Sequence, residues 1–149
     1  MPSTGLKALD ATIEKTNIWL KGVMEGLGTN DRHRAYLALA AVLHALRDRL
    51  PSDEVIDLGA QLPMLIRGLY YEGWSPACQP IKHDRNSFLQ YIRDQFRTEP
   101  ILDAELVARA VFKVIAKQVD AGEIRDVKNV LPKDLRELWE FKEDQDVRQ

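Results

Sequence analysis

The chain has 149 residues, in which 21 basic and 23 acidic side chains leave a formal net charge of −2. Hydrophobic residues make up 45% of the chain and charged residues 30%, a mixture typical of a folded domain and too apolar for a disordered chain. This near balance creates no field that would gather polyanions, so we expect neither nucleic acid nor an acidic membrane surface as a partner.

Cysteine content and apolar run lengths indicate the compartment. Cys78 is the single cysteine, so it forms no disulfide within the chain, which favours a reducing compartment. Charged residues interrupt the first twenty positions, so we expect no signal peptide there. The longest uncharged apolar run, residues 35–43, is too short to cross a bilayer. The sequence therefore predicts a cytoplasmic protein with no membrane partner.

Apolar residues recur at helical spacing, and no segment alternates with a period of two, so the sequence predicts helices without a sheet. In the first half we expect helices over residues 10–27, 31–50, 53–60 and 63–71. The second of these is apolar on most sides, which is typical of a central helix. Thr29 or Asn30 is expected to cap it, and Ser52 is expected to cap the third helix. Leu62-Pro63 should begin the fourth, with proline in its first turn.

A connection follows over residues 73–86, where Pro76 and Pro80 interrupt any helix. The second half then predicts helices over residues 87–96, 104–119, 123–129 and 132–141. Thr98 or Asp103 is expected to cap the longest of them. The charged residues 142–149 should form a frayed tail.

The two halves resemble each other when the chain is shifted by 69 residues. Residues 20–71 then align without a gap on residues 89–140, and 12 of the 52 pairs are identical. Identical pairs include Glu54/Glu123 and Arg67/Arg136, and conservative apolar pairs such as Val23/Ile92 fill further positions. We therefore predict an all-α fold and a single domain over residues 1–149. It contains two pseudo-repeated units of about four helices each, residues 10–72 and 84–141, which are joined by the linker 73–86 and pack into one compact bundle.

Three strings, residues 41–51, 59–74 and 131–139, resemble the bacterial domain-of-unknown-function family 2267. The resemblance extends from about residue 9 to residue 140. It implies an all-helical fold of two similar halves, and it implies no catalytic residue because no reaction is assigned to that family.

No residue pattern supports metal, cofactor or catalytic chemistry. His33 and His44 share a helix face, but eleven residues of helix place them about 16 Å apart, too far for one metal ion. Cys78 and His83 could form a nucleophile and base in the linker, although chance proximity explains them as well. The sequence thus predicts no metal ligand, no cofactor and no catalytic residue.

Charged clusters receive structural interpretations. The recurring acids, Glu54 and Asp57 with Glu123 and Asp126, favour a brace from Asp57 and Asp126 to Arg67 and Arg136 over an acid/base pair. Isolated glycines at 26, 28 and 59 follow no strand and do not form a phosphate loop. A small basic cluster is interpreted as a solvated helix end and contains Arg32, His33, Arg34, Arg47 and Arg49.

The sharpest difference between the halves lies in the fourth helix. The first half has Met64, Leu65, Gly68 and Tyr71 where the second has lysine, aspartate and two glutamates. This apolar stripe is either the internal seam between the units or a surface for a protein partner or for self-association, and a groove for a small apolar ligand is a further alternative. In the surface interpretation, the candidate residues are Met64, Leu65, Gly68, Tyr70, Tyr71 and Trp74.

The sequence supports two hypotheses of biochemical function. The first is a non-enzymatic protein-interaction or binding module. The alternative is a small-molecule-binding or enzymatic role centred on the linker Gly73–Asn86, through Cys78, His83 and Tyr71.

Overall fold

The computed structural model describes residues 4–78, 80–97 and 103–141, and within these ranges the chain is helical and contains no strand. No helix in the described ranges is both long and apolar enough to cross a membrane. The α-helices, in chain order, are α1 Lys7–Leu27, α2 Arg32–Arg49, α3 Ser52–Ala60, α4 Met64–Tyr71, α5 Arg85–Asp94, α6 Ala104–Gln118, α7 Ala121–Val130 and α8 Lys133–Arg136. Two short 3-10 helices are η1 Pro76–Cys78 and η2 Glu137–Trp139.

Aspartate side chains start four of these helices. Asp31, not Thr29 or Asn30, caps α2 by accepting a hydrogen bond from the Arg34 amide, and Asp103 caps α6 in the same way. The same residue type caps α5, where Asp84 exchanges hydrogen bonds with Ser87, and α7, where Asp120 is the cap.

Prolines precede the remaining short helices. The N-cap positions of α3, α4 and α8 are occupied by Pro51, Pro63 and Pro132. The predictions had placed Pro63 and Pro132 at the first helical residue, so α4 and α8 begin one residue later than predicted. Ser52 is the first residue of α3 and not its cap. The extended backbone that proline favours fits a cap position, where the chain has not yet become helical.

Three helix boundaries in the two halves fall at matching positions. The ends of α2 and α6 are 69 residues apart, as are the starts of α3 and α7 and the starts of α4 and α8. The duplication and its linker remain predictions about domain organisation, which superposition of residues 20–71 on 89–140 would test.

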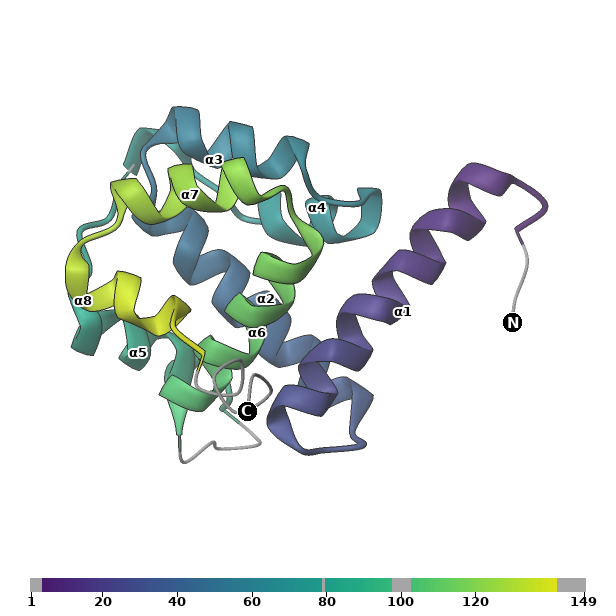
Figure 1. The fold of residues 1–149 in the computed structure, drawn as a ribbon, viewed down its shortest axis with the longest axis horizontal. Coiled ribbons are helices and arrows are strands. Elements are labelled where there is room, and N and C mark those ends of the chain that lie inside the picture. Colours follow the sequence, from purple (N-terminus) through teal and green to yellow (C-terminus); the bar gives the residue numbers. More distant parts are fainter. Residues whose placement is uncertain (1–3, 79, 98–102, 142–149) are drawn as a thin grey trace, which may run out of the picture.

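The core is formed by helices that cross between the halves. The central helices α2 and α6 contact each other, α1 packs on α6, and α2 packs on α5. Their buried side chains join one continuous apolar cluster that also includes Trp19, Phe88, Phe112 and Trp139. Figure 1 shows α2 and α6 running through the middle of the molecule, with α3 and α7 next to each other at one end.

Two glycines let α1 approach α6 closely. A Cβ atom added to Gly22 would lie 2.8 Å from Cγ2 of Val114, and one added to Gly26 would lie 2.8 Å from the Cβ of Ala110. Real Cβ atoms do not approach other carbon atoms so closely, so the absence of side chains at these two positions sets the distance between the helices.

The N-terminal half of α1 projects from the body (Figure 1). The helix has 21 residues, whereas α5 has 10, and it starts at Lys7 instead of the predicted Asp10. The prediction placed the start too late because Leu6, the N-cap residue, contributes no side-chain hydrogen bond that a sequence pattern could reveal. We call residues 6–15 the arm.

Gly26→Ala should destabilise the fold by about 1–3 kcal/mol, because its methyl group would meet both the side chain and the backbone of Ala110. Urea unfolding followed by circular dichroism measures this change. The control is Gly68→Ala, at a helical position where an added Cβ meets no atom within 4 Å. The control should stabilise the protein by about 0.4–1 kcal/mol. Equal behaviour of the two variants would contradict the close crossing.

Candidate functional site

The apolar stripe on α4 is largely exposed. The side chains of Met64 and Leu65 have exposed fractions of 53% and 48%, and Gly68 is also exposed. The seam between the halves is formed instead by the contacts of α1 with α6, α2 with α5 and α6, and α3 with α7. These three residues therefore face away from the seam, which removes the internal-packing interpretation for them.

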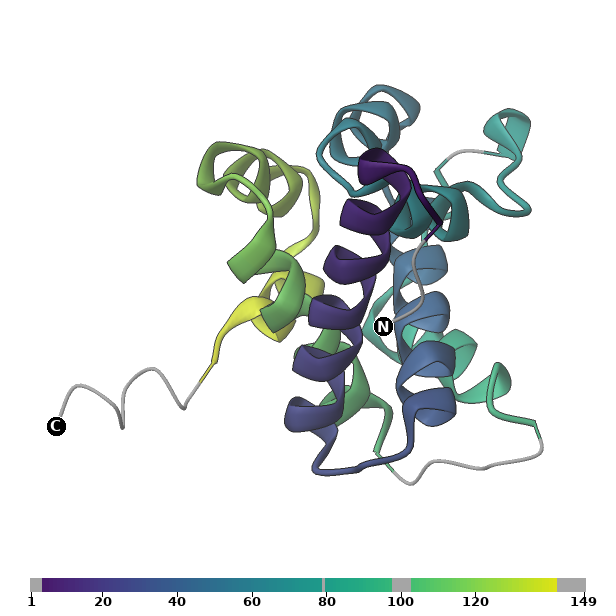
Figure 2. The ribbon, with the colours of Figure 1, turned by 90° about the vertical axis from the view of Figure 1, so that its right-hand side faces the viewer.

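The arm lies beside this stripe. The backbone amide of Leu65 donates a 3.2 Å hydrogen bond to Oγ1 of Thr12, a buried residue of α1. Figure 2 shows α1 at the front of the molecule with α4 next to it. Leu9 lies about one turn before Thr12 and Leu6 about two, and their exposed fractions are 36% and 60%. We call Leu6, Leu9, Met64, Leu65 and Gly68 the arm surface.

The aromatic residues on and after α4 are buried or partly buried, so they offer little exposed area to a partner. Tyr70 is fully buried, and its hydroxyl donates a 2.9 Å hydrogen bond to the Val55 carbonyl. Tyr71 is partly buried, and its ring lies 5.0 Å from that of Tyr70 and 5.6 Å from that of Trp74. The Nε1 atom of Trp74 is buried without a hydrogen-bond partner. Of the six predicted surface residues, Tyr70 belongs to the core, and Tyr71 and Trp74 support it from the outside.

A buried arginine of α2 binds the carbonyl groups at the C-terminal end of α4. The side chain of Arg47 is 5% exposed, forms an ion pair with Asp48 at 2.9 Å, and donates to the carbonyl oxygens of Tyr70 and Glu72. Beside it, Nε2 of His44 lies 2.7 Å from the Leu69 carbonyl, and burial lowers the pKa of this histidine. These contacts satisfy carbonyl groups that the end of a helix leaves unpaired.

The predicted basic cluster is therefore dispersed. Arg47 is buried, the side chain of Arg49 donates to the His83 carbonyl, and that of Arg32 donates to Asn17. The interpretation as one solvated helix end was wrong for Arg47, because the sequence shows its charge but not the carbonyl groups that approach it.

The fourth helix of the second half is polar because it binds Arg85. The backbone amide of Arg85 donates to the Asp134 carboxylate, and its guanidinium contacts Glu137 at 3.3 Å and Glu105 at 2.6 Å. The hydrogen bond from Arg85 holds the pKa of Glu105 below its usual range. In the first half, the residue equivalent to Arg85 is Thr16, which directly follows the arm within α1.

The linker contains both Cys78 and His83. Cys78 ends η1, and residue 79 lies outside the described residues. The linker is attached to α2 where the Ile81 amide donates to the Asp48 carbonyl, and the ring of His83 lies 6.2 Å from the ring of Tyr91. His83 is half-buried because it packs against Tyr91 where the linker is attached to the body.

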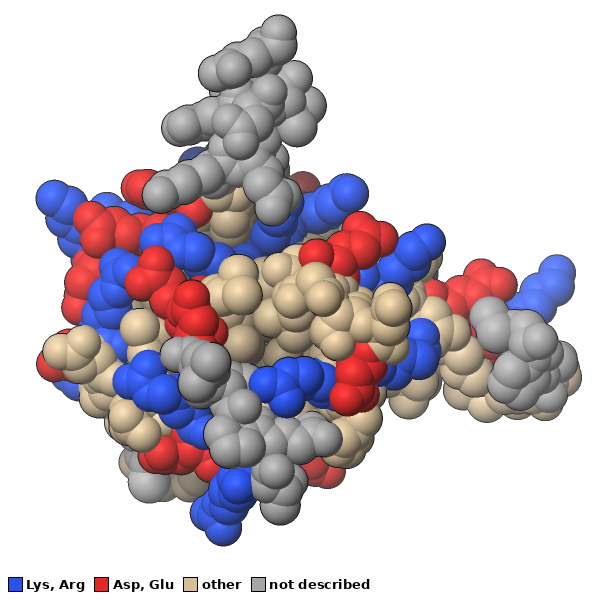
Figure 3. Space-filling model, turned by 90° about the horizontal axis from the view of Figure 1, so that it is seen from below, with Lys and Arg blue, Asp and Glu red and all other residues tan. Residues whose placement is uncertain are grey.

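A groove of about 460 Å³ runs between α1 and α6. Its floor is apolar where Gly22 and Gly26 meet Ala110 and Val114, and its rim carries charges of both signs. Figure 3 shows uncharged atoms at the centre of the lower face of the molecule with basic and acidic side chains around them.

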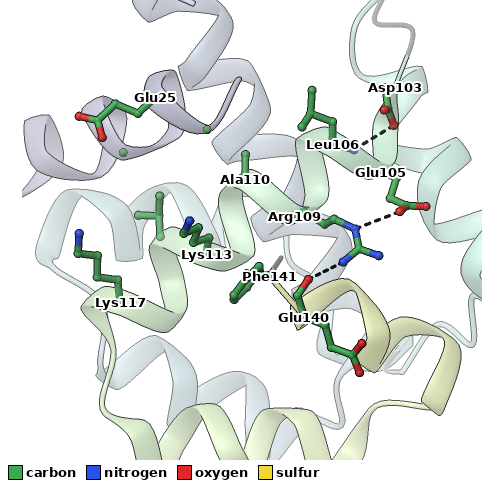
Figure 4. Close-up of a pocket in the computed structure, with 13 residues that line it drawn as sticks. Glu25, Asp103, Glu105, Leu106, Arg109, Ala110, Lys113, Lys117, Glu140 and Phe141 are labelled. Carbon is green, nitrogen blue, oxygen red and sulfur yellow. Dashed lines mark hydrogen bonds and ion pairs between the residues drawn. The ribbon is translucent and has the colours of Figure 1, made fainter. Parts of the chain in front are cut away.

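The cationic rim of the groove is largely engaged. Figure 4 shows Arg109 bound to Glu105 and to the Glu140 carbonyl, with Glu25 on the opposite helix from Lys113 and Lys117. Because acids and bases share the rim, the groove presents no site of one sign for a charged ligand. Its glycines serve the helix crossing, and Gly28, with a φ of 67°, ends α1 in the left-handed conformation.

The recurring arginines do not form the predicted braces with aspartates. Arg67 donates to the carbonyl oxygens of Gly59 and Leu62, and Arg136 donates to that of Leu131. Each arginine thus binds the C-terminal end of the preceding helix, where carbonyl groups lack partners.

The recurring glutamates meet each other. Glu54 on α3 and Glu123 on α7 form a carboxyl–carboxyl contact where these two helices pack. Recurrence was the sequence signal for this pair, but a repeat pattern does not say that equivalent positions will touch. Among the described residues, no group of three or more His, Cys, Asp or Glu side chains has the arrangement of a metal site.

The chain matches a known protein family. A family model described as "Uncharacterized conserved protein (DUF2267)" matches residues 16–138. No curated protein matches the chain.

Tyr70→Phe should lower the free energy of unfolding by about 1 kcal/mol, because the buried Val55 carbonyl would lose its closest hydroxyl donor. Tyr71→Phe is the matched control, since its hydroxyl lies 3.5 Å from the same carbonyl and should contribute much less. Urea unfolding compares the two variants. Equal losses of stability in both variants would contradict the assignment of this hydrogen bond to Tyr70.

Burial also raises the pKa of Tyr70, so its phenolate absorbance should appear only as the protein unfolds in alkali.

Proposed function

The chain belongs to the DUF2267 family of uncharacterized conserved proteins, and from its surface we propose that it is a non-enzymatic interaction module that associates with a second copy of itself. The observation that carries this proposal is the arm surface. Four large apolar side chains remain exposed on two adjoining elements, an arrangement that is costly in water unless another molecule covers it.

The geometry of the arm supports a protein partner. The arm projects from the body, so a second molecule can reach its exposed side without displacing the core (Figure 1). The hydrogen bond between Leu65 and Thr12 holds α4 against the arm. An apolar surface whose backbone is already fixed loses little conformational entropy when it binds.

The charges of the arm favour a second copy as the partner. Lys7 and Lys15 balance Asp10 and Glu14, so the arm carries no net charge and two copies do not repel each other. A strongly acidic or basic partner would gain nothing from such a surface. Two-fold dimers are the commonest homo-oligomers, and they place the same patch of each subunit at the interface.

The linker hypothesis has weaker support. His83 packs on Tyr91 and its carbonyl group binds Arg49, so its contacts are those of a residue that attaches the linker to the body. We therefore place the proposed function on the arm surface and in the cytoplasm, as the single cysteine suggests.

Sedimentation velocity over a hundredfold range of protein concentration tests the proposal, because self-association makes the average mass rise with concentration. Met64→Asp should weaken the dimer at least about tenfold, since a carboxylate would be buried at the interface. It should change the Tm by no more than about 2 °C, because the side chain is exposed in the single molecule.

Ile56→Asp is the matched control for this experiment. Ile56 is as exposed as Met64, at 55% against 53%, but it lies on α3 and is not part of the arm surface. The control variant should associate like the original protein. A monomer at every concentration, or equal weakening by both substitutions, would overturn the proposal.

A further inference from the structure

The first turns of α3 and α7 bring two carboxyl groups together. Glu54 lies in the first turn of α3 and Glu123 in the first turn of α7, and these helices pack against each other. Figures 1 and 2 both show α3 and α7 side by side at the same end of the molecule. The two glutamates therefore join one predicted repeat unit to the other.

Each of these glutamates has one unsatisfied oxygen. The Oε2 atoms of Glu54 and of Glu123 are buried, and neither has a hydrogen-bond partner. A buried carboxylate oxygen without a donor is costly, and two carboxylates in contact also repel each other. One proton shared by the pair supplies the missing hydrogen bond and removes the repulsion. The protonated carboxyl group then donates a hydrogen bond to the carboxylate of the other glutamate.

The surroundings favour one negative charge on the pair and oppose two. Both glutamates lie at helix N-termini, where the helix dipoles stabilise an anion. From the same helices, Asp57 and Asp126 add negative charge that acts on Glu123. A pair that keeps one proton has the favourable charge, and a fully ionised pair does not.

Among the described contacts, the packed neighbour α4 directs no hydrogen-bond donor to the pair. Its Tyr70 hydroxyl is committed to the Val55 carbonyl, Tyr71 lies beside it, and Arg67 donates to the carbonyl groups that end α3. The guanidinium of Arg47 on α2 is held by Asp48 and by the end of α4.

We propose that Glu54 and Glu123 form a proton-dependent clasp that holds α3 against α7, closed when the pair carries one proton and open when both carboxyl groups are ionised. The clasp differs from the arm surface in position and does not depend on self-association. Its chemistry is acid–base only, with the proton exchanged with water.

Electrostatics gives the pH range of the clasp. Burial, the contact with Glu54 and the nearby aspartates raise the pKa of Glu123 to about 8. The folded protein therefore holds a proton that the unfolded chain releases near the ordinary glutamate pKa of about 4.3. The stabilisation is complete below the unfolded pKa and is lost as the pH rises through the folded pKa.

The test is the pH dependence of thermal stability in the original protein and in Glu123→Gln. Glutamine keeps the size of the side chain and donates a hydrogen bond to Glu54, but it does not ionise. Between pH 6 and pH 9 the Tm of the original protein should fall by about 5 °C more than that of the variant. Glu54→Gln should give the same result, and Glu14→Gln, on the exposed side of the arm, should leave the pH profile unchanged.

Hydrogen exchange tests whether the clasp opens locally. At pH 9 the amides of α3 and α7 should exchange at least about tenfold faster in the original protein than in Glu123→Gln, while the amides of α2 and α6 exchange equally. Comparison at one pH cancels the effect of pH on intrinsic exchange. Identical Tm profiles, or equal protection of α3 and α7 in both proteins at pH 9, would overturn the proposal.

Discussion

The close crossing of α1 and α6 is the contact on which the rest of the structure depends. Gly22 and Gly26 allow the backbone of α1 to approach Ala110 and Val114, so a helix from the first half packs directly on the central helix of the second. The crossing also positions the arm, because α1 is one continuous helix whose N-terminal half extends beyond the body. Its length and its packing together determine which apolar side chains remain uncovered.

The two halves use similar helices for different purposes. Asp134 on α8 and Glu137 at the start of η2 bind Arg85, so the polar side chains at that end of the second half have partners. At the equivalent place in the first half, Leu65 binds Thr12 through its backbone and keeps its side chain in solvent. The difference between the fourth helices therefore follows from what precedes each half: an arm in one case and the linker in the other.

The buried arginine side chains show where the charge pattern of the sequence fails to predict the hydrogen-bond partner in the structure. The sequence interpretation placed Arg47 in a solvated basic cluster, whereas the structure buries it against the end of α4. It also paired Arg67 with Asp57, whereas the guanidinium binds the carbonyl groups of Gly59 and Leu62. In both cases the true partner is a backbone carbonyl at a helix end. A pattern of side-chain charges cannot reveal such a partner, because every residue carries a carbonyl group.

The sequence by itself determined the helical class, the approximate helix boundaries and the apolar positions of the core, because helical periodicity and capping residues act over a few neighbouring positions. It also identified Met64 and Leu65 as unusual, since a polar equivalent exists 69 residues later. Only the tertiary structure decided that these side chains face solvent and that Glu54 touches Glu123. Both outcomes depend on how distant helices pack, and that packing depends on shape and distance rather than on the order of residues along the chain.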